Sequence, residues 1–214
     1  MGEGNNQSVS RGVITTEMDK LSGKHAVRFV QHLESLGYDS FWIPELFGRE
    51  PMATAGYLLA QTTRINVASG IANIYVRDPH SMLQTRHTLS EFSEGRFILG
   101  LGVSNAGLNE RRGHTWRPPI RKMEDFLDAM SAADSASSPA QSDSPVYLAA
   151  HGPRMQAVAA ARTDGVLTYL MSPVHTQLTR TRVGPEADIS VVCVLLAETD
   201  PTAARQPARE ALAY

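Results

Sequence analysis

Short apolar runs alternate along this chain with longer stretches in which apolar residues recur at helical spacing. One such stretch places Phe29, Val30 and Leu33 on one helical face, and Gly37 follows it as a left-handed stop. The apolar runs are continuous rather than alternating, as in residues 189–196, which is typical of strands buried on both faces of a parallel sheet. The pattern therefore predicts repeated βα units, with a parallel sheet covered by helices.

The strand pattern predicts a barrel that lacks its last unit. The predicted strands cover residues 11–16, 40–45, 65–71, 96–103, 146–150, 166–170 and 189–196. A helix follows each strand, and the last helix begins at Asp200–Pro201 and still continues at Tyr214. Since a closed (β/α)8 barrel needs eight units and typically ~250 residues, we expect an α/β fold of the (β/α)8 TIM-barrel type, C-terminally truncated to about seven βα units. A doubly wound open sheet is the alternative.

Length and charge narrow the class of protein. The 214 residues suffice for a sizeable core, so we predict a single domain over 1–214, with the Ala/Ser/Asp/Pro-rich segment 131–145 as a flexible surface linker. A formal net charge of −2 gives no electrostatic footprint for nucleic acid or an anionic membrane. Residues 1–12 lack a signal-peptide pattern, and the apolar runs fall far below the ~20 residues of a membrane helix, so we expect a cytoplasmic protein. Cys193 stands in an apolar run and is predicted to be a buried strand thiol.

Two of the predicted strands end in glycine and small residues, at 70–73 and at 100–104. Ligands of parallel α/β folds bind at the carboxyl ends of the strands. Glycine at such an end lets the backbone come close to a flat or phosphorylated ligand. We therefore predict a cofactor site at these two strand ends, although Gly100-Leu101-Gly102 taken alone is also compatible with a tight strand-to-loop turn.

A second candidate site follows the strand predicted at 146–150. Gly152 precedes Pro153, which would be the first helical residue, and this order leaves free N–H groups at the positive end of a helix. Such an end can hold a phosphate, and Arg154 could pair with it. The alternative is an ordinary βα turn with a solvated arginine.

Two side chains are the candidates for catalysis. Glu45 ends the second predicted strand, where a carboxylate could accept a hydrogen bond from a cofactor or act as a base. The alternative for Glu45 is an acid at a helix start that faces water. Residues 105–119, rich in arginine and aromatic residues, are predicted to form a loop. His114 in this loop is the best candidate for contacting a substrate, against the alternative of a simple solvated loop. The histidines show no metal-ligand spacing, and no metal site is predicted.

Two longer segments stand out, Gly-Ile-Ala-Asn-Ile-Tyr-Val-Arg-Asp-Pro at 70–79 and Gly-Arg-Phe-Ile-Leu-Gly-Leu-Gly-Val-Ser at 95–104. Together they resemble the bacterial-luciferase-like oxidoreductase superfamily, and most closely its coenzyme F420-dependent branch. The segments 36–45, 152–155 and 164–165 support the resemblance, which extends from Gly12 to Tyr214. Each motif is loose by itself, but their order and spacing together are specific.

The resemblance implies a (β/α)8 barrel that binds a flavin or deazaflavin at the carboxyl face of its strands. It also implies a non-proline cis peptide at Gly70–Ile71, as a bulge that supports the cofactor ring. Thr168, at the end of a strand, matches a position used for the cofactor tail. With Glu45, the candidate cofactor-binding residues are Gly70, Ile71, Asn73, Gly102, Val103, Ser104, Ala150, His151, Gly152, Pro153, Arg154, Met155 and Thr168.

The activity that this resemblance implies is hydride transfer between coenzyme F420 and an unidentified small organic substrate, with Glu45 and His114 as candidate catalytic residues. The protein would hold the ring against the substrate and exclude water, since the redox chemistry belongs to the cofactor. One alternative is an FMN-dependent luciferase-like monooxygenase, and another is an inactive truncated barrel fragment. Some relatives carry an Asp-His pair after strand two, where this chain has Glu45–Leu46. The resemblance also implies a homodimer packed through the early helices.

Overall fold

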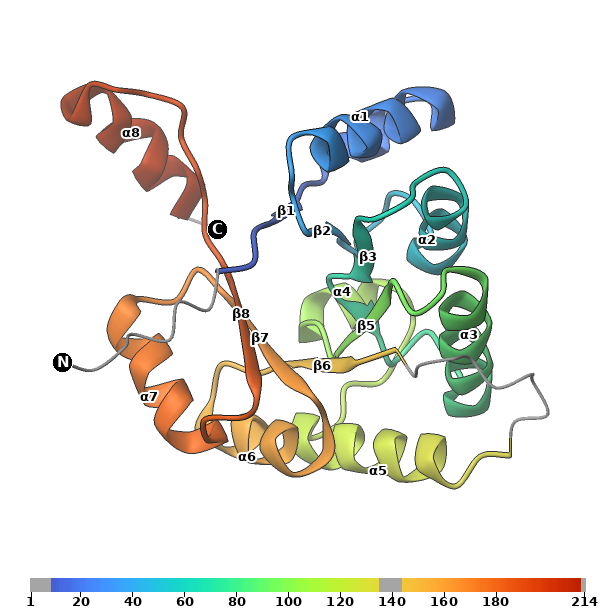
Figure 1. The fold of residues 1–214 in the computed structure, drawn as a ribbon. Coiled ribbons are helices and arrows are strands. Elements are labelled where there is room, and N and C mark those ends of the chain that lie inside the picture. Colours follow the sequence, from blue (N-terminus) through green and yellow to red (C-terminus); the bar gives the residue numbers. More distant parts are fainter. Residues whose placement is uncertain (1–8, 135–143, 213–214) are drawn as a thin grey trace, which may run out of the picture. The chain divides into compact units, whose positions relative to one another are not determined.

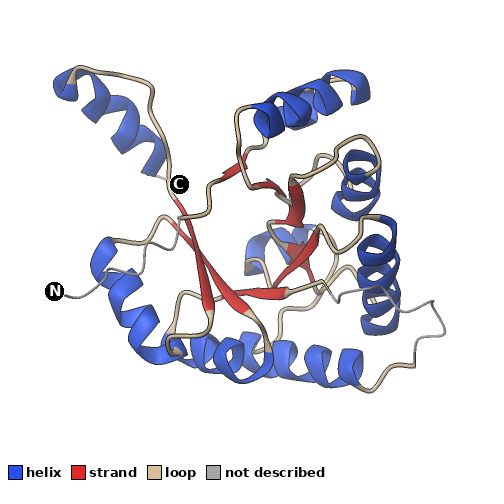
Figure 2. Cartoon of the chain, in the orientation of Figure 1, coloured by secondary structure: helices blue, strands red, loops and turns tan. Residues whose placement is uncertain are grey.

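The structure is a computed structural model that describes residues 9–134 and 144–212 (Figure 1). These residues form two compact units, which are divided after Val146. Within each unit strands and helices alternate along the chain, as Figure 2 shows. In the part of the chain that the structure describes, no helix is both long and apolar enough to cross a membrane.

The first unit is built on a parallel sheet. Its strands are β1 (Gly12–Ile14), β2 (Ser40–Ile43), β3 (Asn66–Ser69), β4 (Ala72–Asn73) and β5 (Phe97–Gly102). Its helices are the 3₁₀ helix η1 (Glu17–Lys20), α1 (Gly23–Ser35), α2 (Pro51–Leu59), α3 (Pro79–Phe92), α4 (Ala106–Arg111) and α5 (Pro119–Ser131). The strands pair in the order β1-β2-β3-β5, and their register aligns Val13, Phe41, Val67 and Phe97 in one row. The short strand β4 pairs with β5.

The core of the first unit lies between this sheet and its helices. Phe41, Val67 and Phe97 are fully buried, as the continuous apolar runs predict. Helix α2 packs on β3, α3 packs on β5, and α5 packs on α3. The ring of Phe29 on α1 meets the ring of Phe41 edge to face, with the centroids 6.0 Å apart. Burial of these aromatic side chains removes a large apolar area from water and so holds the strand ends in place.

The second unit continues the βα pattern. Its elements are β6 (Val146–Ala149), α6 (Pro153–Arg162), β7 (Gly165–Tyr169), α7 (Pro173–Val183), β8 (Asp188–Val192) and α8 (Pro201–Leu212). The strands are again parallel, with Leu148 opposite Val166 and Val166 opposite Ile189. Helix α6 packs on β7 and on α7.

Several local predictions are confirmed. The predicted βα order and the parallel pairing are both present in each unit. Gly37 follows α1 with a φ of 79°, the left-handed conformation that glycine adopts without a steric penalty. The peptide bond between Gly70 and Ile71 is cis.

The predicted strand bounds need correction. The strand predicted over 65–71 is two strands, because β3 ends at Ser69 and β4 begins at Ala72, on the other side of the Gly70–Ile71 peptide. The strand predicted over 40–45 ends at Ile43, before Pro44, which has no N–H to give to a ladder.

The prediction that Cys193 is buried is wrong, since the structure places this thiol at the surface. The ladder between β7 and β8 ends with the pair Tyr169 and Val192, so Cys193 lies beyond the last paired residue. Helix α5 ends at Ser131, and most of the linker predicted over 131–145 lies outside the described residues. The single domain over 1–214 stays a prediction.

Candidate functional site

Glu45 lies two residues beyond β2 and is held by charged and backbone partners. Its side chain is only 7% exposed, so it does not face water. Its Oε2 forms an ion pair with Arg77 and accepts a hydrogen bond from the N–H of Asn73, at 2.8 Å. Its Oε1 lies 3.6 Å from Nη1 of Arg112. Both carboxylate oxygens therefore have partners, which favours a role in holding strand ends together over proton transfer.

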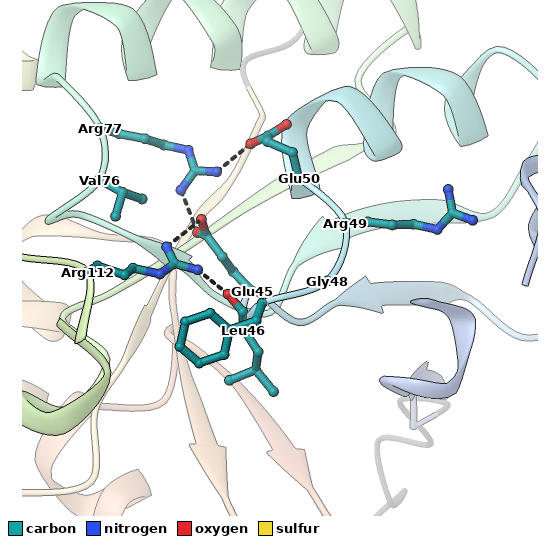
Figure 3. A pocket seen from close by; sticks show the side chains of 9 residues that line it. Glu45, Leu46, Gly48, Arg49, Glu50, Val76, Arg77 and Arg112 are labelled. Atoms are coloured by element: carbon teal, nitrogen blue, oxygen red, sulfur yellow. Dashed lines mark hydrogen bonds and ion pairs between the residues drawn. The ribbon is translucent and has the colours of Figure 1, made fainter. Parts of the chain in front are cut away.

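A pocket with a volume of about 520 Å³ opens beside this carboxylate (Figure 3), within the range of small-molecule sites. Arg77 reaches across it to form a second ion pair with Glu50. At its edge, the exposed ring of Phe47 packs under the guanidinium of Arg112, at 5.4 Å. The lining residues are Glu45, Leu46, Phe47, Gly48, Arg49, Glu50, Val76, Arg77 and Arg112. Figure 3 shows Arg77 and Arg112 converging on Glu45, whereas Arg49 points away from it.

The carboxyl ends of β3, β4 and β5 bring the predicted residues of the first unit together. Asn73 stands directly opposite Gly102 in the ladder between β4 and β5. The N–H of Gly70 donates to the carbonyl of Ile43 at 2.8 Å, which joins this end to that of β2. The structure therefore gathers Glu45, Gly70, Ile71, Asn73, Gly102, Val103 and Ser104 at one edge of the sheet.

Gly70 occupies a close-packed position, where an added side chain would have to displace its neighbours. A Cβ atom there would lie 2.9 Å from Cδ1 of Ile14 and 3.2 Å from Cβ of Trp42. Gly70 and Ile71 are each half-buried, so this edge is partly accessible to a ligand. This close-packed, glycine-bearing edge fits a flat ring that approaches the backbone directly.

Asn109 also contacts this edge of the sheet, although no sequence pattern singles it out. The segment 105–119 was expected to be a loop, but it contains helix α4, whose first turn is capped by the side chain of Asn105. The Asn109 side chain is fully buried and contacts Asn73. An asparagine at 105 followed by apolar Leu108 is a helix-start signal that could have predicted α4, but not the partner of Asn109.

His114 lies after α4, next to a stacked aromatic pair. Its backbone N–H donates to the carbonyl of Asn109 at 3.0 Å, and its ring centroid lies 6.1 Å from that of Tyr75. Tyr75 stacks on Trp116, with centroids 5.5 Å apart, and the ammonium of Lys122 lies 5.2 Å from the Tyr75 centroid. Burial lowers the pKa of Lys122, and the nearby charge of Arg117 lowers it further. A half-buried imidazole beside aromatic rings suits substrate contact, which stays a prediction for His114.

In the second unit, the predicted phosphate seat has the expected backbone. Gly152 is the N-cap of α6 and Pro153 is its first residue. No described side chain caps this end, so its N–H groups remain available to an anion. A Cβ atom at Gly152 would meet nothing within 4 Å, so the approach is open. Arg154 is exposed beside it, whereas Met155 is buried and packs inward.

Gln156 holds the backbone before this seat. Its side chain is fully buried, and its Nε2 donates to the carbonyl of His151 at 3.1 Å and to Thr179 at 2.9 Å. Its Oε1 accepts from Arg182 at 3.1 Å. No sequence pattern singles out Gln156. Ala150 is buried, and the fully buried hydroxyl of Thr168 in β7 has no hydrogen-bond partner among the described residues. An unpaired buried hydroxyl is costly, and a ligand atom could satisfy it.

His151 gives this segment a pH-dependent element. Partial burial lowers the pKa of its ring, and the charge of His175 lowers it further. Nε2 of His151 accepts a hydrogen bond from the N–H of Tyr169, which protonation of that nitrogen would abolish. The folded state therefore favours the neutral ring.

We expect the stability of the protein to fall as the pH drops below about 6.5, because there the unfolded chain takes up a proton that folded His151 resists. Above that pH both states carry a neutral ring and this contribution is constant. The thermal midpoint, measured between about pH 7.5 and 5.5, should fall less in His151→Gln than in the unaltered protein. His80→Gln, at an exposed position of α3, is the matched control. Equal pH dependence of the unaltered protein and His151→Gln would contradict this prediction.

Comparisons with known proteins identify the family of this chain. The sequence profile of a family described as luciferase-like monooxygenase matches residues 8–212. A 5,10-methylenetetrahydromethanopterin reductase from Archaeoglobus fulgidus is 25% identical over 172 residues, which cover 72% of this chain and 52% of that protein. The chain thus spans about half the length of the curated relatives it matches.

Solved structures show the same fold. An F420-dependent secondary alcohol dehydrogenase, in complex with an F420–acetone adduct, matches with a TM-score of 0.71 at 16% identity, over 85% of this chain and 68% of that one. The oxygenating constituent of 3,6-diketocamphane monooxygenase from Pseudomonas putida, in complex with FMN, matches with a TM-score of 0.66 at 13% identity, over 81% of this chain and 62% of that one. These likenesses confirm the predicted α/β fold of the TIM-barrel type.

Proposed function

Because the chain belongs to the luciferase-like monooxygenase family, we propose that it is an oxidoreductase that transfers a hydride between coenzyme F420 and a small organic substrate. The observation that carries this proposal is the gathering of Gly70, Asn73 and Gly102 at one edge of the first unit's sheet. F420-dependent proteins stand among both the relatives and the structural neighbours, which supports a deazaflavin.

The residues of the first unit would bind the ring of the cofactor. The backbone at Gly70 and Gly102 would lie against it, since neither position carries a side chain that keeps a ring away. Ser104 would offer its hydroxyl, and His114 would contact the substrate. When bound, F420 supplies a ring that accepts or donates a hydride.

The residues of the second unit would bind the tail of the cofactor. The N–H groups that begin α6 at Gly152 would hold a phosphate, with Arg154 as its charged partner. The Thr168 hydroxyl, which has no hydrogen-bond partner in the described part of the chain, would donate to an oxygen of the tail. His151 and Gln156 would keep this segment in place, and they need not touch the cofactor themselves.

Titration of the purified protein with F420 and with FMN tests the proposal. We expect a change in ring absorbance and a dissociation constant in the micromolar range for one of them, with F420 favoured. Riboflavin, which lacks the phosphate of FMN, should bind more weakly than FMN, because the seat at Gly152 then has no anion to hold. The absence of any absorbance change with both phosphorylated cofactors would contradict the proposal.

A pair of variants on α6 controls this titration. Arg154→Gln, at the first turn, should weaken binding of the phosphorylated cofactor several-fold, by about one charge-assisted hydrogen bond. Arg162→Gln, at the exposed other end of the same helix, should leave the dissociation constant unchanged. Equal effects of the two substitutions would place the phosphate away from this end of α6.

An FMN-dependent monooxygenase is the second candidate, favoured by the FMN-bound structural neighbour. Oxygen consumption in the presence of FMN and a flavin reductase would distinguish it, because reduced flavin activates oxygen and a deazaflavin does not do so readily. An inactive fragment would bind neither cofactor. The homodimer and the cytoplasmic location stay predictions.

A further inference from the structure

A chain of buried polar side chains joins the ends of three strands in the first unit. It begins at Glu45 after β2, which accepts from the backbone N–H of Asn73 in β4 at 2.8 Å. Nδ2 of Asn73 donates to Oδ1 of Asn109 at 2.7 Å. Nδ2 of Asn109 then donates to the carbonyl of Val103, one residue beyond β5, at 2.8 Å, and to the carbonyl of Asn105 at 3.0 Å.

In both asparagine side chains the amide nitrogen donates hydrogen bonds and the amide oxygen accepts one. Asn109 accepts at its oxygen and donates twice from its nitrogen. Asn73 donates to Asn109 from its nitrogen, and its Oδ1 accepts from the N–H of Tyr75 at 3.1 Å. Both side chains are fully buried, so water cannot replace a lost partner without a rearrangement. A carboxylate of the same shape has no donor and cannot serve in either place.

Charged groups fix the Glu45 end of this hydrogen-bonded series of side chains. Arg77 and Arg112 hold the carboxylate of Glu45, and Arg112 also donates to the carbonyl of Leu46. The side chains of Arg77 and Arg112 are only 13% and 21% exposed. Solvent therefore screens these ion pairs less than it screens ion pairs at the surface. The backbone of β4 is thus attached to the segment after β2 by charged groups, and to α4 by amides.

At its other end, this hydrogen-bonded series of side chains meets a turn in the backbone after β5. Val103, whose carbonyl bonds to Asn109, is followed by Ser104 with a φ of 57°, a conformation that non-glycine residues rarely adopt. The bond from Asn109 holds the Val103 carbonyl toward α4 and so favours this turn. Gly102, Val103 and Ser104 are the residues proposed above to bind the cofactor ring.

We infer that Asn109 is a positioning residue for the cofactor site, acting together with Asn73. It holds the backbone of 102–104 beside that of 71–73, and it does not itself touch the cofactor. This inference rests on the proposed function. Without the amide, the Val103–Ser104 segment would occupy several conformations, of which only one binds the cofactor. The measured dissociation constant would rise as the fraction of protein in that conformation falls.

The test compares the cofactor affinity of Asn109→Asp with that of the unaltered protein. The aspartate keeps the shape of the side chain but replaces both donors with an oxygen that faces two carbonyls. The dissociation constant for whichever of F420 and FMN the unaltered protein binds is expected to rise about ten-fold or more. It is measured at a temperature at which circular dichroism shows every variant to be folded.

Ser93→Ala is the matched control, because it removes a buried hydroxyl that forms hydrogen bonds within the same unit. The Ser93 hydroxyl is buried at the end of α3 and donates to the carbonyl of Leu89 at 2.6 Å. It should lower the thermal midpoint and leave the dissociation constant unchanged. Where Asn109→Asp does not fold, Asn109→Ser takes its place, since its hydroxyl keeps one donor but is too short to bridge Asn73 and Val103.

The outcomes separate this inference from the proposed function. A folded Asn109 variant with a dissociation constant within about two-fold of the unaltered value overturns the inference alone. A rise of the same size in Ser93→Ala also overturns it, because the effect would then follow stability in general. Failure of the unaltered protein to bind either cofactor overturns the proposed function, and the inference with it.

Discussion

Arg77→Met is expected to lower the free energy of unfolding by about 3 kcal/mol, because it leaves a buried carboxylate without its main partner. The side chains of Arg77 and Glu45 are 13% and 7% exposed. After the substitution Glu45 keeps the N–H of Asn73 and the more distant guanidinium of Arg112, at 3.6 Å. These partners compensate only part of the cost of burying the charge, so the effect falls at the lower end of the range for broken buried ion pairs.

Urea unfolding followed by circular dichroism measures this loss. Arg121→Met is the control, because Arg121 is 75% exposed and pairs with Asp125 at 2.9 Å on the surface of α5. Its removal should change the unfolding free energy by less than about 1 kcal/mol. Adding Glu45→Gln to Arg77→Met should restore part of the stability, since the buried carboxylate that Arg77 neutralised is then absent. Similar losses for Arg77→Met and Arg121→Met would show that burial of the Glu45 pair does not matter.

Gly100→Ala is expected to cost about 3 kcal/mol or more, because β3 leaves no room for a side chain on β5 at this position. A Cβ atom at Gly100 would lie 2.0 Å from the carbonyl oxygen of Ser69, which is backbone and cannot swing aside. Ser69 also bonds to Gly100 through its hydroxyl, which donates to the Gly100 carbonyl at 2.8 Å and accepts from its N–H at 2.9 Å. The added methyl group would separate the two strands and break these bonds.

The same unfolding experiment tests Gly100→Ala against Gly107→Ala. Gly107 is exposed in α4, and a Cβ atom there would meet its nearest neighbour at 3.7 Å. Alanine is the better helix former, so Gly107→Ala should leave the stability unchanged or raise it by up to about 1 kcal/mol. Because Gly100 lies just before the proposed ring-binding residues, Gly100→Ala should also abolish cofactor binding. A Gly100→Ala protein as stable as the unaltered one would mean that the strands can shift apart at little cost.

Much of the fold could be predicted from the sequence, because its signals are local. Continuous apolar runs indicated the buried parallel strands, and Gly37 marked the end of α1. The cis peptide at Gly70–Ile71 came from family resemblance, which carries information that a single chain does not. The prediction failed where an apolar run extends beyond the last paired residue of its strand. Cys193 continues such a run but lies beyond the pairing of β8 with β7.

By itself the sequence determined the βα order, the family and the strand ends at which the cofactor residues should lie. Only the tertiary structure decided what those residues touch. Glu45 has the same local signal whether it faces water or pairs with Arg77, which stands 32 positions away in the chain. Asn109 looks like any helical asparagine until α4 packs and its amide meets Asn73, 36 positions away. Buried polar partners are chosen by packing between distant segments, and no short stretch of sequence records that choice.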